Sequence, residues 1–174
     1  MPKFEDRQIL KYPREMLYGI ARDVAKYPEF LPWCSGARVF GEKPDANGSG
    51  QFDADLVIGF KMFRERFTSR VTYRDFEAVD AAYIKGPMKH CINRWRFKDA
   101  GEGATQVDFY VDFELANRVM QVAVEDMFLT ASQKMITAFK DRAASLSAGR
   151  QVKSKPRVAS SSPFLQMLDA RRRD

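Results

Sequence analysis

Histidine and cysteine are almost missing from this chain of 174 residues, which contains one histidine and two cysteines. Cys34 and Cys91 are too few for a disulfide framework or a zinc cluster, and they suit a reducing compartment. The single His90 disfavours most metal sites and any catalytic triad of the Ser-His-Asp kind. Glycine-rich phosphate loops and metal-ligand spacings are absent as well. This composition gives little support for a metal site or for a catalytic centre built on histidine, and we expect no metal.

Long apolar runs are missing too. No uncharged apolar segment approaches the ~20 residues that a membrane span needs. The first residues, "MPKFEDRQILKY", contain Glu5 and Asp6 and lack the apolar core of a secretory signal. Hydrophobic residues make up 45% and charged residues 30% of the chain, as in soluble globular domains. The sequence thus predicts one domain in the cytoplasm.

Positive charge is concentrated at the carboxyl end. Residues 149–174 carry seven Lys and Arg and two Asp, so they supply +5 of the net charge of +6. We expect a domain over residues 1–148 and a basic tail over 149–174. The tail is either disordered and solvated, or it contacts the phosphates of anionic lipid or RNA. Its "SPFLQMLDARRR" string fits a short amphipathic helix.

Hydrophobic periodicity predicts the order of elements. Residues 4–11 read as a strand, and Pro13 opens a helix. From Ala37 onward side chains alternate with period two, which predicts about six strands, the clearest over 52–60, 63–74, 91–98 and 105–115. Asn117 caps a helix of about 30 residues that Gly149 ends. The prediction is an α+β fold in which a curved antiparallel sheet wraps one long amphipathic helix.

Charged residues on the polar faces predict the register of the last hairpin. We expect Arg94 and Arg96 to lie across from Asp108 and Asp112. The stripe formed by Arg64, Arg66, Arg70 and Arg74 is either a solvated strand face or a nucleic-acid surface. It lacks the interleaved aromatics that are usual in RNA readers.

Methionine and aromatic residues dominate the faces that should meet between sheet and helix. That space is either filled or a pocket, since Met suits both packing and irregular ligands. Glu65, Ser69 and Asn93 fall on the same apolar faces and need partners if buried. Their partners are one another, water or a ligand head group. The alternative for Glu65 is that a strand end or a bulge places its side chain in solvent. The apolar residues concerned are Met120, Met127 and Met135 on the helix and Phe52, Phe63, Phe67, Trp95 and Phe109 on the sheet.

The segment "YPEFLPWCSG", residues 27–36, is unusually apolar for a connection. Its two prolines and its glycine allow at most one short helical turn. Phe30, Leu31 and Trp33 therefore either cap the core or border an apolar cavity or a membrane.

Three strings, "ARDVAKYPEFLPWCSGARV", "FRERFTSRVTYR" and "GPMKHCINRWRF", resemble the coenzyme-Q-binding START-domain family. It is part of the polyketide cyclase/dehydrase-like superfamily and includes ribosome-association toxins. The resemblance covers about residues 4–148. It implies a helix-grip fold, in which a seven-stranded antiparallel sheet grips a long carboxy-terminal helix around a hydrophobic tunnel. It also implies binding of ubiquinone or a similar isoprenoid lipid, as a chaperone or carrier that supports respiration. On this resemblance we expect a binding protein that is not an enzyme and has no cofactor.

The resemblance places Phe30, Leu31 and Trp33 at the mouth of the tunnel, as a lid or an edge that dips into the membrane interface. Contact with the inner face of a membrane follows from that placement. Two alternatives stay open, a regulator that binds the ribosome and a polyketide cyclase-type enzyme. The candidate ligand-binding residues are Phe30, Leu31, Trp33, Phe52, Phe63, Glu65, Phe67, Ser69, Asn93, Trp95, Phe109, Val124, Met127, Phe128 and Met135.

Overall fold

A single antiparallel sheet and one long helix make up most of the computed structural model, which describes residues 2–60 and 63–154. The sheet has seven strands in the order β1-β7-β6-β5-β4-β3-β2. The predicted α+β helix-grip fold is therefore confirmed. The elements are β1 (Lys3–Leu10), α1 (Arg14–Arg22), the 3₁₀ turn η1 (Val24–Lys26), α2 (Tyr27–Phe30), β2 (Cys34–Pro44), β3 (Gly50–Phe60), β4 (Phe63–Arg74), β5 (Ala78–Lys85), β6 (Met88–Gly101), β7 (Ala104–Leu115) and α3 (Arg118–Ser154).

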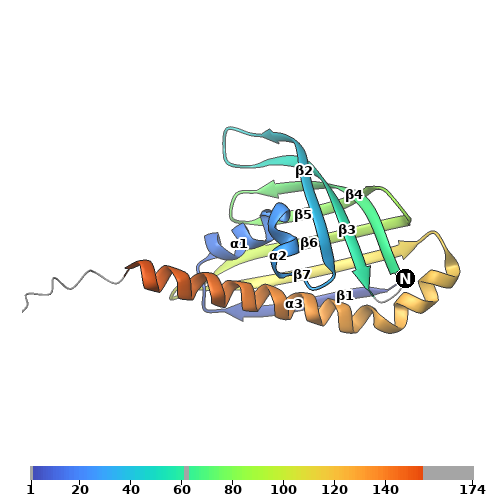
Figure 1. Cartoon of the computed structure of the whole chain (residues 1–174). Coiled ribbons are helices and arrows are strands. Elements are labelled where there is room, and N and C mark those ends of the chain that lie inside the picture. Colours follow the sequence, from blue (N-terminus) through green and yellow to red (C-terminus); the bar gives the residue numbers. More distant parts are fainter. Residues whose placement is uncertain (1, 61–62, 155–174) are drawn as a thin grey trace, which may run out of the picture.

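The long helix α3 runs across the concave face of the sheet, and α1 and α2 lie beside its carboxyl-terminal half (Figure 1). Its start is fixed as predicted, because Asn117 Oδ1 accepts hydrogen bonds from the backbone N–H groups of Val119 (2.9 Å) and Met120 (3.2 Å). No helix in the described part of the chain is long and apolar enough to cross a bilayer.

The predicted end of this helix is wrong. Gly149 lies inside α3, which continues to Ser154, so the expected boundary between residues 148 and 149 falls within the helix. Gly149 does not adopt the left-handed conformation of a helix cap. A glycine inside an exposed helix costs only about 1 kcal/mol relative to alanine, which neighbouring helix formers can offset. The predicted tail helix lies outside the described residues.

The register of the last hairpin matches one of the two expected pairs. Arg96 lies across from Asp108, but Arg94 lies across from Tyr110, and Asp112 faces Ile92. Arg94 therefore packs its guanidinium 5.6 Å from the Tyr110 ring. The strands have the predicted alternation, and the irregularity at Asp99 and Gly101 sets which residues face each other.

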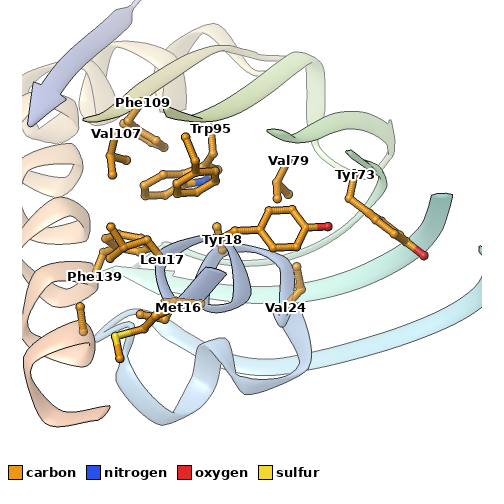
Figure 2. Packing of buried hydrophobic residues seen from close by; sticks show 14 of the residues in the cluster. Met16, Leu17, Tyr18, Val24, Tyr73, Val79, Trp95, Val107, Phe109 and Phe139 are labelled. Carbon is orange, nitrogen blue, oxygen red and sulfur yellow. The ribbon is translucent and has the colours of Figure 1, made fainter. Parts of the chain in front are cut away.

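Aromatic side chains form the core at the end of the sheet that α1 covers. The Trp95 ring lies 4.5 Å from the Phe109 ring and 4.6 Å from the Phe139 ring, measured between centroids. Figure 2 shows Leu17 and Tyr18 of α1 facing this group. Each fully buried side chain of this size contributes about 1.5–3 kcal/mol. This packed end anchors α3, and the sheet remains less filled toward the start of that helix.

Candidate ligand-binding cavity

An apolar cavity in two compartments lies between the concave face of the sheet and α3. The inner compartment has a volume of about 190 Å³ and the outer compartment about 230 Å³. They abut, because six residues line both of them. These shared residues are Trp33, Ile58, Phe67, Cys91, Val111 and Met135.

The inner compartment lies next to the packed core and is the more enclosed of the two. Nine of its 19 wall residues are buried, against three of 16 for the outer compartment, so the outer compartment lies nearer the surface. The segment over residues 27–33 closes the inner compartment on one side, with Tyr27, Phe30, Leu31 and Trp33 among its walls. This segment contains one helical turn, α2, as its prolines predict.

The outer compartment is bordered by the first half of α3 and by the start of β6. Val124, Met127 and Phe128 contribute from α3, and Pro87 and Met88 from the other side. A β-bulge between Met88 and His90 adds one residue to β6 there. Lys89 on this bulge pairs with Glu114, with 3.1 Å between Nζ and Oε1.

Polar groups are few on the cavity walls, and each compartment has different ones. Ser69, which is 5% exposed, and Asn93 line the inner compartment, whereas Glu65 and Ser132 line the outer one. Within the described part of the chain none of these four side chains makes a hydrogen bond to protein. Glu65 thus faces the cavity and is half-buried, while the three predicted polar residues do not meet at one point.

Twelve of the fifteen candidate residues lie on the walls of one or both compartments. Phe52 and Phe109 do not, since they are 3% and 2% exposed within the packed core. Phe52 packs against Tyr73, and Phe109 against Trp95 and Phe4. Phe63 begins β4, and its side chain lies outside the described part. The twelve are Phe30, Leu31, Trp33, Glu65, Phe67, Ser69, Asn93, Trp95, Val124, Met127, Phe128 and Met135.

Sequence reasoning missed several wall residues. Ile58 and Val111 share the inward faces of strands whose other residues were chosen, so the alternation contained the signal. Ser132 lies one turn after Phe128 on the apolar stripe of α3, where a polar residue is easily overlooked. Cys91 reaches both compartments. Burial, with Asp112 nearby, raises the pKa of its thiol to about 12, so the thiol is neutral at physiological pH.

Two contacts fasten α2 to its surroundings. The Tyr27 hydroxyl donates a hydrogen bond to the Ala21 carbonyl, and burial raises the pKa of this phenol. Arg142 of α3 pairs with Glu29 and places its guanidinium 5.3 Å from the Phe30 ring. The segment over residues 27–33, called the lid segment below, is therefore tied to α3, which contributes Met135 and Phe139 to the same compartment.

Acidic partners neutralise part of the arginine stripe on the convex face of the sheet. Asp55 accepts hydrogen bonds from Thr68 (2.6 Å), Arg66 (2.8 Å) and Arg38 (2.9 Å), which lower the pKa of its carboxyl to about 2. Asp53 pairs in the same way with Arg70. This arrangement favours the solvated-face interpretation over a nucleic-acid surface.

The chain matches the family model described as polyketide cyclase / dehydrase and lipid transport over residues 10–140. It is 31% identical over 147 residues to the ribosome association toxin RatA of Rickettsia prowazekii, covering 82% of this chain and 97% of that protein. It is 27% identical over 135 residues to the mitochondrial coenzyme Q-binding protein COQ10 of Dictyostelium discoideum, covering 76% of this chain and 64% of that protein.

A solved structure has the same architecture. The 18 kDa protein CC1736 of Caulobacter crescentus superimposes with a TM-score of 0.71 at 29% identity, covering 85% of this chain and 99% of that one. The resemblance that the three sequence strings indicated is confirmed by these comparisons.

Proposed function

Because this chain belongs to the polyketide cyclase/dehydrase and lipid transport family, we propose that it binds a quinone with an isoprenoid chain, of the ubiquinone type, and carries or chaperones it. The observation that supports this most is the pair of abutting apolar compartments beneath α3. An isoprenoid chain needs apolar contact along its length, and each square ångström removed from water contributes about 25 cal/mol. The name of the coenzyme Q-binding relative supports the same ligand class.

The size of the cavity supports one elongated ligand that occupies both compartments. Pockets for drug-sized ligands measure roughly 300–1,000 Å³, and each compartment alone is smaller than this range. A ligand that fills only one would leave apolar walls uncovered in the other. A ring with a flexible chain can pass the boundary at Trp33 and Met135 and contact both sets of walls.

The walls support binding more than catalysis. Glu65 is the one carboxylate among the described wall residues, and His90 lies on the convex face with its Nε2 atom 3.3 Å from Asp112 Oδ2. General acid–base chemistry uses proton donors and acceptors within reach of the same substrate atom. The relatives from Rickettsia prowazekii and Dictyostelium discoideum are named for ribosome association and for coenzyme Q binding.

The test is mass spectrometry of the organic-solvent extract of freshly purified full-length protein. We expect a polyprenyl quinone in near-stoichiometric amount. The control is an equal amount of a protein of another fold, purified the same way from the same cells. Equal quinone in both extracts, or none in either, contradicts the proposal.

A second candidate function, association with the ribosome, is favoured by the similarity to RatA and by the basic charge of residues 149–174. Sedimentation of the full chain with ribosomal subunits at low and high salt tests it. Cosedimentation that salt weakens supports contact with ribosomal RNA, since such contacts release counterions. Absence from the ribosomal fractions at low salt contradicts this function.

A further inference from the structure

We infer that the ligand binds ring first, with its ring in the inner compartment and its isoprenoid chain in the outer one. This inference rests on the proposed function, because it concerns the orientation of the same ligand. It follows from the way the structure divides the polar wall residues between the two compartments.

Two hydrogen-bond donors face the inner compartment. Ser69 belongs to β4 and Asn93 to β6, with β5 between them. Ser69 pairs with Tyr83 of β5 and Asn93 with Ala81, two residues away along the same strand. With about 4.8 Å between adjacent strands and about 3.3 Å per residue, the two are about 10 Å apart across the sheet and about 7 Å along it, or about 12 Å in all. A quinone ring carries carbonyl oxygens at opposite edges. A hydroxyl and an amide at this separation are placed to donate to both edges of one such ring.

The apolar surroundings of these donors point to a ligand. Ser69 is 5% exposed and Asn93 is partly buried, and neither has a protein partner in the described part of the chain. A buried polar group without a partner is unfavourable by about 1–3 kcal/mol. Acceptors that the ligand brings into the compartment remove that penalty. An isoprenoid chain has no acceptor and cannot do so.

The inner walls also suit a flat ring. Trp95 and Phe67 contribute aromatic surface from the sheet, and Tyr27 and Phe30 contribute it from the lid segment. Offset or edge-to-face contact between aromatic groups adds about 0.5–1.5 kcal/mol beyond burial. The compartment's enclosure keeps water away from the donors, which strengthens their hydrogen bonds.

The outer compartment offers less to a ring oxygen. The Glu65 carboxylate accepts hydrogen bonds, so it disfavours a carbonyl oxygen beside it. Ser132, on α3, is the one serine or asparagine among its described wall residues, so the outer compartment lacks the pair that Ser69 and Asn93 form in the inner one. The remaining walls are mainly aliphatic and thioether groups such as Val124, Met127 and Met88. They suit a flexible apolar chain.

The test compares two probes on the full-length protein by calorimetric titration. One is a ubiquinone with two isoprene units, and the other is farnesol, a chain without the ring. We expect Asn93→Leu and Ser69→Ala each to weaken ubiquinone binding about three- to tenfold, the size of one hydrogen bond, and to leave farnesol affinity unchanged. The control Thr72→Ala removes a hydroxyl from the exposed face of the same strand as Ser69, away from both compartments, and we expect less than a threefold change for ubiquinone.

The outcomes separate the orientation from the function. If Asn93→Leu and Ser69→Ala leave ubiquinone affinity unchanged, or Thr72→Ala weakens it as much, the ring-first orientation is overturned while the proposed function stands. If the wild-type protein binds neither probe, the proposed function fails. Thermal unfolding midpoints show whether the variants are folded. Both substitutions remove a buried polar group, so we expect midpoints that are unchanged or raised.

Discussion

Arg142 and Glu29 form an ion pair that joins the middle of α3 to the lid segment, with 2.6 Å between Nη2 and Oε2. The Glu29 side chain is 55% exposed, so the pair lies at the surface, while Phe30 beside it reaches the inner compartment. Exposed pairs contribute only about 0.2–1 kcal/mol to stability. The pair is therefore suited to holding the lid closed without making its opening slow.

Replacing Arg142 should make the lid open more often. We expect Arg142→Gln to raise the dissociation rate of a bound quinone about two- to fivefold, which corresponds to the strength of an exposed ion pair. Stopped-flow displacement by excess quinone measures this rate. Arg7→Gln, which removes an exposed pair with Asp108 far along the chain, is the matched control. Equal rates for Arg142→Gln and wild type would show that the pair does not hold the lid.

Filling the outer compartment should exclude lipid. Met127 lines this compartment, and Met127→Trp places a larger ring in it. We expect at least half of the extractable lipid to be lost, with a folding penalty of about 1–3 kcal/mol or less. Val122→Trp is the matched control, because Val122 lies on the same helix and is 65% exposed. An equal loss of lipid in both variants would place the lipid elsewhere on the protein.

Asp55 should make the protein more stable at neutral pH than in acid. Thr68, Arg66 and Arg38 lower the folded-state pKa of Asp55 to about 2, below its ordinary value of 3.8. This stabilisation is complete above about pH 4 and is lost as the pH falls toward 2. The shift corresponds to about 2 kcal/mol, and solvent screening of the exposed arginines reduces it to roughly 1–2 kcal/mol.

Urea unfolding of Asp55→Asn checks this effect. At pH 7 we expect the variant to be less stable than wild type by roughly that amount, with the difference shrinking as the pH approaches 2. Asp53→Asn serves as the control, since its carboxylate is more exposed, 24% against 10%, and its loss should be smaller. A difference that is the same at both pH values argues against titration of Asp55 as the cause.

Removing the carboxyl-terminal segment should affect membrane contact rather than folding. A chain that ends after Ser154 keeps the whole of α3 and loses Lys155, Arg157 and Arg171–Arg173. We expect its melting temperature to stay within a few degrees. We expect less cosedimentation with anionic liposomes at low salt, because each basic residue near such a surface contributes about 1 kcal/mol. The difference should vanish at high salt. Equal binding by both chains would direct attention to ribosomal RNA as the partner.

Local sequence signals predicted most of the fold. Period-two alternation identified the strands and their inward faces, and Asn117 marked the start of α3. The helix end predicted at Gly149 was wrong because a helix cap is defined by backbone conformation, which the residue type alone does not determine. The Arg94 pairing failed for a similar reason, since one irregular turn shifts a register that no local signal specifies.

The depth of the cavity could not be predicted from the sequence. Phe52 and Phe67 have the same alternation and the same composition around them, yet Phe52 lies in the core and Phe67 lines both compartments. What separates them is how far α1 and α3 reach across the sheet. Leu17 and Phe139 fill one end, whereas the described residues leave the outer compartment at the other. That depends on long-range packing, so sequence patterns identified the lining face but not its filled portion.

The bulge at Lys89 allows β6 to lose one residue beside the outer compartment without turning its inward side chains outward. A strand that gains or loses one residue normally exchanges its inward and outward side chains. Here Lys89 and His90 both point away from the cavity, and Met88 and Cys91 both line it. Deleting Lys89 would leave a regular alternation with Met88 and Cys91 still inward. Deleting Lys89 would therefore change the bend of β6 beside the outer compartment, while the rest of the sheet keeps its register.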